Sequence, residues 1–438
     1  MSSFTHQFTI TLALFAALFF PCQVHAGGGY FSLGYGHVGK QMAGAVTAVA
    51  EDAFAGSSNP GKLTAVGNQL EFGIELLNPN REVKRQGATD SATIYNFSST
   101  SRNSVFVIPD FAYSRQVNEK LAIGITIYAN GGLNNEYATT TEIPGTSANP
   151  EACDNKPGNF FVGCGHAGFD LSQLIIAPTI AWKFLPGHSI GFTPLIAAQR
   201  FEAFGLQAFA PVSSDPDNLT NNGHEVVFGA GARIGWYGEL KPWLSMGAAY
   251  SSKVYMQQFK RYKGLFAEGE FDVPANYSIG IAIKPVNNWT IAVDIQRIEY
   301  SKIKALSNGV LNSLVPGGPL MGTSSGSGFS WQRDQINYKL GLSYNVSNHL
   351  TLRTGYEFGH RTNEDNLNAV SIGVLTPNSE HRASVGFSWE SQGGNEFHMA
   401  LAHFFKDPYS GPSAIIPGSK ESLEAHANTL HISWNKSF

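Results

Sequence analysis

The stretch Ile336–Tyr344 reads Ile-Asn-Tyr-Lys-Leu-Gly-Leu-Ser-Tyr, with apolar residues at every second position and polar or small residues between them. A period of two indicates a β-strand with one apolar and one polar face. This pattern recurs about fourteen times between Gln69 and Phe438, in runs near the ten residues that a tilted strand needs to cross a bilayer. The sequence therefore predicts an all-β protein, a transmembrane antiparallel β-barrel of about 14 strands.

The connections between these runs support the same architecture. Short turns alternate with long polar loops, which is typical of a barrel with tight periplasmic turns and long outer loops. The short turns lie at Val117–Lys120, Leu185–His188, Glu239–Pro242, Pro285–Asn288, Val346–His349 and Ser391–Asn395.

The first expected strand covers Gln69–Leu77 and the last covers Asn428–Phe438. In the last strand Trp434 and the terminal Phe438 fall on one face. A terminal aromatic residue on the lipid face resembles the signal that the barrel-assembly machinery of bacterial outer membranes recognises. The machinery is therefore an expected partner during biogenesis, along with the outer membrane lipid.

The amino terminus indicates export. Ile10–Phe20 is apolar but too short to span a membrane, and Val24-His25-Ala26 is a small-x-small cleavage site. We interpret residues 1–26 as a signal peptide, although Met1–Ile10 lacks the usual Lys or Arg.

The charge bears on binding to nucleic acid, and the cysteines bear on whether the chain has a disulfide or a metal site. The net charge of -4 over 438 residues, with no basic run, argues against nucleic acid. Cys22 falls in the signal peptide, and Cys153 and Cys164 share the loop Gly131–Asp170. An even pair outside the cytoplasm favours a disulfide, whereas metal ligation would have only His166 nearby.

Residues 27–65 differ from the rest of the mature chain and form the predicted hatch segment, followed by the barrel at residues 66–438. Met42, Val46, Val49 and Ala53 are spaced to share one side of a short helix, which the turn Asn59-Pro60-Gly61 ends. The natural place for such a segment is inside the lumen, as a plug, because a wide barrel is otherwise open. A periplasmic tail is the alternative.

The sequence gives no support for nucleotide binding or catalysis, because the motifs that could indicate them lack the required neighbours. Gly34-Tyr-Gly-His-Val-Gly39 matches a dinucleotide fingerprint but follows a signal peptide, and Gln41 stands where a phosphate loop needs Ser or Thr. No paired-histidine zinc motif or EF-hand loop is present. We therefore expect no enzyme, cofactor or metal site, although spacing alone leaves open a Ser/His pair on the outer rim.

Several motifs resemble the FadL/TodX-type outer-membrane transporters. The strongest are Gly44–Ala53 and Ser58-Asn59-Pro60-Gly61, where the family has Asn-Pro-Ala. Others are Gly131-Gly132, Tyr262–Ala267, Val273–Tyr277, Asp294–Arg297 and Tyr338–Gly341. The resemblance implies a fourteen-stranded barrel with a hatch and a side opening, and uptake of long-chain fatty acids or aromatic hydrocarbons.

Apolar residues in the loops and the hatch segment are candidate ligand contacts, because a bare barrel offers them neither lipid nor a core. The candidates are Tyr30, Phe31, Phe160, Phe161, Leu314 and Met321, and packing of the loops against one another is the alternative. By alternation Lys339, Arg353 and Arg382 face the lumen. Arg353 is the candidate contact for a carboxylate head group, but pairing of these cations with the inward acids Glu71, Glu75, Asp294 and Glu357 is favoured.

Prolines gather in neighbouring strands at Pro109, Pro178 and Pro194. Proline gives no ladder hydrogen bond, so each must lie where strand pairing is already broken. We predict a gap or inward bend in the wall, at Pro109 and Asp110, that serves as a lateral exit. An ordinary bulge is the alternative.

These observations favour passive uptake of hydrophobic small molecules by a monomer in the outer membrane of a Gram-negative bacterium. A general or substrate-specific porin is the second hypothesis, and an outer-membrane hydrolase or adhesin is the third. A porin needs an open lumen and a constricting loop rich in charged residues. The long loop Gly131–Asp170 carries few charges, which argues against a porin.

Overall fold

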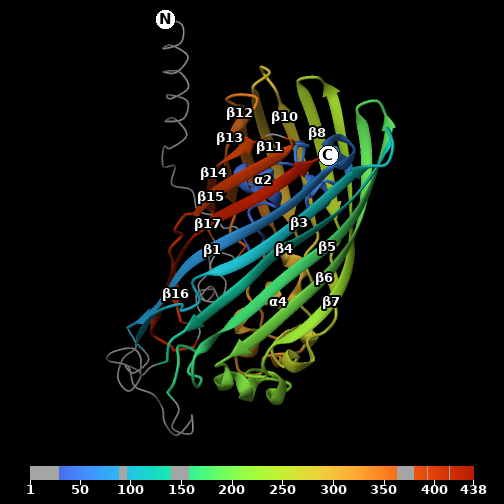
Figure 1. Cartoon of the computed structure of the whole chain (residues 1–438). Coiled ribbons are helices and arrows are strands. Elements are labelled where there is room, and N and C mark those ends of the chain that lie inside the picture. The colour runs from blue at the N-terminus through green and yellow to red at the C-terminus, as the bar shows by residue number, and fades with distance from the viewer. Residues whose placement is uncertain (1–28, 88–95, 140–156, 363–378, 392, 414) are drawn as a thin grey trace, which may run out of the picture.

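A computed structural model describes residues 29–438 except 88–95, 140–156, 363–378, 392 and 414. The predicted signal peptide and Cys153 lie outside these described residues. The described chain forms a closed antiparallel β-barrel (Figure 1), which confirms the fold predicted from the sequence.

The wall is built from fourteen strands in the described part of the chain. They are β1 (Gln69–Gln86), β3 (Phe106–Gln116), β4 (Leu121–Tyr137), β5 (Ala167–Leu185), β6 (His188–Phe204), β7 (Glu225–Lys241), β8 (Leu244–Ser251), β10 (Asn276–Ile283), β11 (Trp289–Ile298), β12 (Gln335–Asn345), β13 (Leu350–Gly359), β14 (His381–Glu390), β15 (Asn395–Phe404) and β17 (Lys420–Ser437). Each strand pairs with the next, and β1 closes the wall against β17 from Gln69↔Ser437 to Gln86↔Lys420. Short strands β2 (Phe97–Thr100), β9 (Tyr255–Met256) and β16 (Tyr409–Pro412) pair with β1, β7 and β17.

The first and last strands are longer than the sequence predicts. The expected strand Gln69–Leu77 continues to Gln86, and the last strand begins at Lys420 instead of Asn428. Residues 78–86 are mostly polar on both faces, so the apolar alternation ends although backbone pairing continues. Alternation marks the part of a strand that meets lipid, whereas hydrogen bonding also extends into water.

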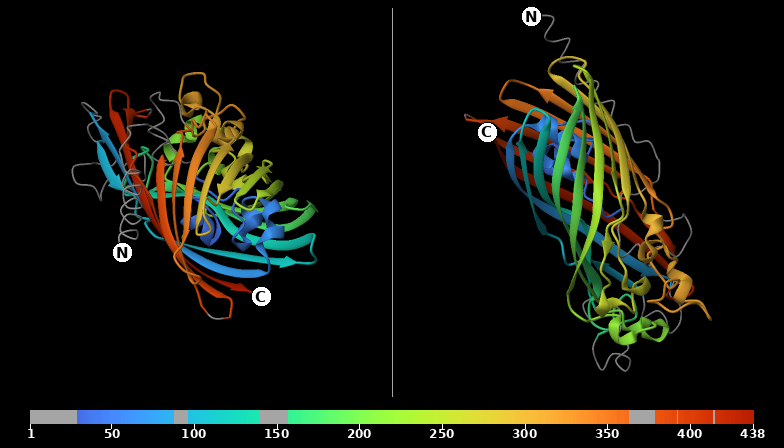
Figure 2. Two further views of the ribbon diagram at one scale, coloured as in Figure 1. Left: turned by 90° about the horizontal axis from the view of Figure 1, so that it is seen from above. Right: turned by 90° about the vertical axis from the view of Figure 1, so that its right-hand side faces the viewer.

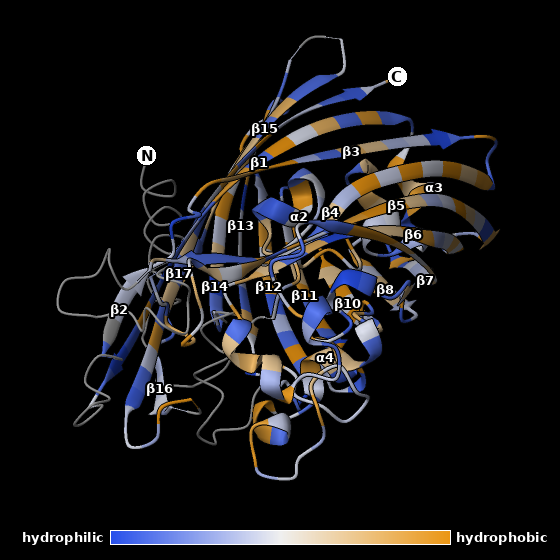
Figure 3. Cartoon of the chain, turned by 90° about the horizontal axis from the view of Figure 1, so that it is seen from below, coloured by the Kyte–Doolittle hydropathy of each residue, from blue (hydrophilic) through white to orange (hydrophobic). Residues whose placement is uncertain are grey.

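Burial along β1 shows the two faces of the wall. Phe72, Ile74 and Leu76 are 50%, 52% and 41% exposed, whereas the intervening Glu71 and Glu75 are buried. Figure 3 shows the same alternation of hydrophobic and hydrophilic residues along the strands. Large apolar side chains over a whole outer face would be unfavourable in water and suit contact with lipid.

The helices are short. Within the described ranges, the α-helices are α2 (Gly36–Gln41), α3 (Leu63–Val66) and α4 (Lys304–Ser307), and the 3₁₀ helices are η1 (Ala53–Ser57), η2 (Pro60–Lys62), η5 (Gln207–Val212), η6 (Pro216–Asn218), η7 (Lys260–Tyr262), η8 (Ala267–Gly269), η9 (Tyr300–Lys302) and η10 (Val310–Ser313). None of the described helices is long and apolar enough to cross a membrane.

The hatch segment, described from residue 29 onward, lies against the inner face of the wall. Helix α2 contacts β13, β14 and β15, whereas η2 contacts β5, β6 and β7 and α3 contacts β3, β4 and β5. A segment that touches opposite sides of a closed wall lies within it, as the view from above shows (Figure 2).

The helix expected across Met42–Ala53 is wrong. Helix α2 ends at Gln41, and the chain then turns through left-handed conformations at Ala43 (φ 48°) and Gly44 (φ 77°). Residues 45–52 have no regular structure.

Wall side chains and neighbouring hatch residues satisfy the backbone of this irregular stretch, so it needs no helix. Thr47 N donates to Asp294 Oδ2 (2.8 Å), Asn59 Nδ2 donates to Thr47 O (2.9 Å), and Lys62 Nζ donates to Val46 O (2.7 Å). The apolar residues that suggested a helix still pack together: Met42, Val46 and Val49 form a buried cluster with Ala282 and Ala292 of the wall.

The outward face of β1 provides a test of the membrane fold. Ile74→Lys should lower the free energy of unfolding from lipid vesicles by about 2–4 kcal/mol, because it places a charge in the hydrocarbon layer. Asn80→Lys, on the same face of the same strand but in its polar extension, is the control and should have little effect. Urea unfolding in vesicles measures both, and equal losses would contradict this orientation of the wall.

Candidate functional site

The long loops form an apolar groove at their end of the barrel. Its cavity volume is about 60 Å³. It is lined by Phe161, Phe169, Leu206, Phe209, Leu265, Phe266, Ala305, Val310, Leu314, Met321, Ser327, Gly328, Phe329 and Ile415. Apart from Phe169 at the start of β5, these residues come from segments between the wall strands that are distant in sequence, so the groove exists only when those loops dock.

Polar contacts between the loops hold the groove together. Ser214 N donates to Met321 O (2.9 Å) and Glu268 N donates to Gly322 O (2.8 Å). Hydrogen bonds from Asn218 and Lys263 hold the pKa of the Asp215 carboxyl below its usual range. The Asp215 carboxylate, 3.0 Å from Lys263 Nζ, therefore stays ionised at neutral pH.

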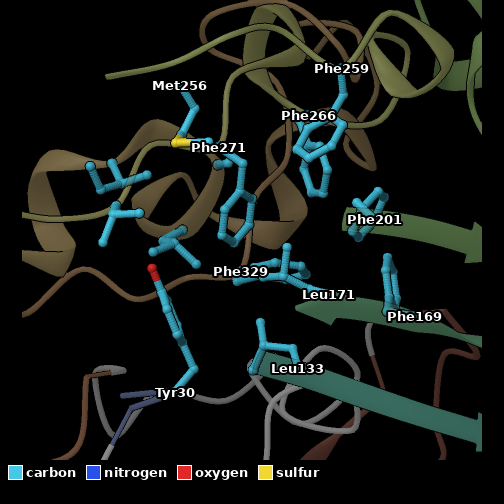
Figure 4. Close-up of a cluster of buried hydrophobic side chains, with 14 of the residues drawn as sticks. Tyr30, Leu133, Phe169, Leu171, Phe201, Met256, Phe259, Phe266, Phe271 and Phe329 are labelled. Atoms are coloured by element: carbon cyan, nitrogen blue, oxygen red, sulfur yellow. The ribbon is translucent and has the colours of Figure 1, made fainter. Parts of the chain in front are cut away.

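Aromatic side chains connect the groove to the interior (Figure 4). The ring of Phe329 lies 6.0 Å from Phe169, 6.4 Å from Phe266 and 6.3 Å from Phe271, and Phe271 lies 6.3 Å from Tyr30. The side chains between the groove and the interior are therefore aromatic, and they are buried in one hydrophobic cluster.

Beyond this cluster lies a larger cavity of about 700 Å³. It reaches from the hatch segment to β3, β4, β5 and β6. Its lining includes Tyr30, Phe31, Leu33, Tyr35, Phe106, Ile108, Pro109, Asp110, Tyr128, Leu133, Leu171, Gln173, Gln199, Arg81 and Arg382. The volume falls within the range of about 300–1,000 Å³ that is common for small-molecule sites.

The structure separates the predicted ligand residues into three groups. Tyr30 and Phe31 line the larger cavity, and Phe161, Leu314 and Met321 line the groove. Phe160 is buried beneath the groove, where it packs edge-on against Phe161 and under the guanidinium of Arg85, 4.1 Å from the ring centroid. The sequence has no signal for this division, because it depends on how the loops fold over the lumen.

Arg353 does not line the cavity in the described structure. Its guanidinium pairs with Glu51 (2.8 Å) and donates to Gln41 (2.8 Å) and Ser388 (2.7 Å). Glu51 and Gln41 belong to the hatch segment, so Arg353 ties that segment to β13. The alternative role, pairing with an acid, fits this placement, but the partner is a hatch residue that alternation along the strands could not reveal.

The other two cations predicted to face the lumen, Lys339 and Arg382, are also paired with an acid. Lys339 lies 3.2 Å from Glu357 and Arg382 lies 3.4 Å from the same carboxylate. Lys40 of α2 lies 2.6 Å from Glu75. Most of the charge facing the lumen is therefore neutralised within the protein.

The strand ladder between β3 and β4 stops at Phe111↔Ile127, one residue after Asp110. Beyond that point β3 still pairs with β1 and β4 still pairs with β5. Arg102 N then donates to Glu136 O (2.9 Å), so the two sides meet again further along. Pro109 and Asp110 lie at one edge of this break, and both line the larger cavity.

Part of the hatch segment runs along the unpaired edge of β4. Ser32 N donates to Asn130 O (3.0 Å), and Phe31 forms an isolated antiparallel bridge with Gly131. A side chain at Gly131 would clash with Tyr30, since its Cβ would lie 2.0 Å from the Tyr30 carbonyl oxygen. The glycine thus permits a close approach that covers the edge from inside.

The other two prolines mark a different kind of interruption. Pairing of β5 with β6 lapses between Ile176↔Ile196 and Ile180↔Phe192, the interval that contains Pro178 and Pro194. The ladder resumes in the same register on both sides, and neither proline lines the larger cavity.

The motif Asn59-Pro60-Gly61 anchors the hatch segment to the wall. Asn59 Nδ2 donates to Thr47 O (2.9 Å) and Trp236 O (2.7 Å), and its Oδ1 accepts from Gly61 N (3.0 Å). A Cβ on Gly61 would lie 2.8 Å from Tyr237 N, so glycine allows the turn to press against β7.

Cys164 is disulfide-bonded. Its expected partner, Cys153, lies outside the described residues, so this pairing stays a prediction.

Comparison with known proteins places the chain in a family. Residues 23–153 and 161–410 match the profile described as outer membrane protein transport protein (OMPP1/FadL/TodX). The chain belongs to this family. A search of curated proteins finds no match.

Solved structures confirm the fold of this family member. The Pseudomonas putida toluene transporter TodX superposes with a TM-score of 0.65 at 16% identity, covering 92% of this chain and 99% of that one. A Pseudomonas aeruginosa FadL homologue gives a TM-score of 0.67 at 13% identity, covering 94% and 100%. The Ralstonia pickettii toluene transporter TbuX gives 0.60 at 15%, covering 92% and 98%. The protein is therefore an outer-membrane β-barrel of the FadL/TodX type.

The anchoring role of Asn59 can be tested. Asn59→Ala leaves the Thr47 and Trp236 carbonyls without their donor, a loss of about 1–3 kcal/mol for each buried group. The hatch segment should then detach more often, and ion conductance in planar bilayers should rise above that of the parent. Asn287→Ala, in the exposed turn between β10 and β11, is the control. If the mutant conducts ions no better than the parent, this motif does not hold the hatch segment in place.

Proposed function

We propose that the protein takes up hydrophobic compounds passively across the outer membrane. The observation that carries this proposal is a series of three neighbouring sections: the apolar loop groove, the aromatic cluster next to it, and the cavity that reaches the break between β3 and β4. Each section offers an apolar solute a better environment than water, so diffusion down a gradient needs no energy source.

The hatch segment favours this function over a porin. Its residues pack against opposite sides of the wall, and they take up lumen space that a general diffusion channel would leave to water. We infer that residues 27–65 act as a plug and that barrel residues 66–438 form the passage around it. Membership of a transporter family argues against an enzyme.

A plugged lumen requires another outlet, and the break at Pro109 supplies a candidate. Apolar residues such as Val107 and Ile108 stand on one side of it and Ala129 on the other. A solute that leaves there would enter the hydrocarbon layer directly, without crossing the short-turn end through water. We propose this break as the lateral exit.

The closed wall agrees with a monomer, because the hatch segment covers the unpaired edge of β4 from inside and so leaves no free strand edge there for a second copy. The carboxy-terminal Phe438 is exposed and stacks beside Tyr113 (6.1 Å between ring centroids). This accessible aromatic end supports recognition by the barrel-assembly machinery.

Closing the break should stop uptake. Val107→Cys with Ala129→Cys places two outward thiols on either side of it, and a short bifunctional reagent can join them. Uptake of a labelled hydrocarbon by cells should fall to background, while ligand binding to purified protein should persist. The control pair is Tyr113→Cys with Ile125→Cys, which already face each other in the ladder. Uptake that continues after complete closure would exclude this exit.

The head group of the solute is a separate question. Arg81 lines the cavity, is only 4% exposed and donates from Nη2 to Asn103 O (2.6 Å). Its Nε is buried without a hydrogen-bond partner, and no described carboxylate forms an ion pair with it. A buried cation without a counter-charge favours a carboxylate ligand, so fatty acids are the preferred substrates over plain hydrocarbons.

This preference can be measured. Arg81→Ala should weaken oleate binding about 10- to 100-fold, from the loss of about 1.5–3 kcal/mol of charged hydrogen bonding, and should spare an alkane or a monoaromatic compound. Arg115→Ala, on the exposed short-turn end of β3, is the control and should leave both unchanged. Binding to purified protein gives the result. Equal losses of affinity for oleate and for the alkane would exclude a head-group role for Arg81. That result would not contradict the proposed uptake of hydrocarbons.

A further inference from the structure

Two histidines and a glutamate meet where the hatch segment touches the wall. His37 belongs to α2, and Glu396 and His398 belong to β15. One ligand atom from each residue lies within 4.8 Å of the other two. The imidazole rings of His37 and His398 stack with centroids 3.5 Å apart and planes 6° apart. Neither histidine belongs to the solute route described above.

Both rings are held in place through Nδ1. His37 Nδ1 lies 3.0 Å from Glu71 Oε1, and His398 Nδ1 lies 2.8 Å from Ser388 Oγ. Each histidine therefore presents Nε2 to the cluster. Histidines that ligate metals are oriented in this way, by a carboxylate or hydroxyl on the other ring nitrogen.

One of these presented atoms has no partner. His398 is 2% exposed, and its Nε2 is buried without a hydrogen bond in the described structure. Buried polar atoms are nearly always satisfied by protein, water or an ion. The unpartnered nitrogen lies close to a second imidazole and a carboxylate, and the ligand atoms of these three groups are near enough to one another for a single ion to reach them after a small movement of the rings.

We propose that His37, Glu396 and His398 form a binding site for a divalent transition-metal ion, of which Zn²⁺ fits best. Two imidazoles and one carboxylate are a common zinc ligand set, whereas Mg²⁺ and Ca²⁺ prefer oxygen ligands. Zinc–nitrogen bonds are about 2.0–2.1 Å, so the stacked rings must tilt toward the ion. Glu396 is half-buried next to the turn before β15, which gives the ion access from the short-turn end.

The ion would join two parts of the molecule. One ligand comes from the hatch segment and two come from the wall, so Zn²⁺ would fasten α2 to β15 beside the Arg353–Glu51 pair. This fastening role rests on the proposed plug, whereas the metal site itself does not. Sequence spacing could not reveal the site, because His37 lies far from the other two ligands along the chain.

The test uses the full mature chain, purified in detergent and stripped with a chelator. Titration with ZnCl₂ in a calorimeter should give one ion per chain at this site, and excess Mg²⁺ should not displace it. His398→Gln and Glu396→Gln should each weaken binding at least tenfold. His403→Gln is the control, since it lies on the outward face of the same strand and its Nδ1 contacts Asn428 (2.8 Å). Loading with Co²⁺ should give visible absorption bands of nitrogen and oxygen ligation that both ligand variants lose.

Heat-dependent migration on gels establishes that each variant is a folded barrel before it is titrated. Absence of Zn²⁺ binding in the folded parent, or binding that His398→Gln and Glu396→Gln leave unchanged, would overturn the site. Planar-bilayer conductance tests the fastening separately. If Zn²⁺ binds at the site and chelation leaves conductance unchanged, the fastening role is excluded and the metal site stands.

Discussion

A strand inside a bilayer has no water to satisfy its backbone, so every wall strand must be paired on both sides. The closed ladder from β1 to β17 meets this demand around the barrel. The demand also makes any opening in the wall costly. Where the ladder between β3 and β4 ends, the protein must satisfy or remove the exposed donors and acceptors by other means.

Two features at the break meet this backbone demand, and a third gives the carboxylate at the edge a partner. Pro109 has no N–H and needs no partner for one. The carboxylate of Asp110 lies 3.0 Å from His431 Nε2, so the charge at this edge points into the lumen and has a partner there. On the opposite edge, Asn130 O accepts from Ser32 N of the hatch segment. The break is therefore tolerated because the segment inside the barrel covers the unpaired edge of β4.

The same segment depends on the polar face of the wall. Lys40–Glu75, Arg353–Glu51 and the contacts of Asn59 join it to β1, β13 and β7. Buried ion pairs contribute little net stability, but they fix one arrangement where apolar packing would permit several. Lipid-facing residues thus hold the barrel in the membrane, and lumen-facing residues position the hatch segment next to the cavity.

Much of this architecture could be predicted from the sequence because its signals are local. Alternation in runs such as Ile336–Tyr344 gives the strands and their inward residues, and Pro109 lies next to the end of the β3–β4 ladder. The helix expected over Met42–Ala53 fails because wall groups such as Asp294 satisfy that backbone. The pairing of Arg353 with Glu51, and the buried position of Arg81 beside the cavity without a described acidic partner, depend on residues that meet only in space.

We propose that solute leaves sideways through the wall between β3 and β4. A crystal of the protein soaked with a brominated alkane tests it most directly, because anomalous scattering locates the bromine without assumptions about the route. The account predicts bromine sites in the larger cavity and in the break between Pro109 and Ala129, with none past α2. Bromine sites that continue beside α2 to the short-turn end, with the break empty, would contradict it.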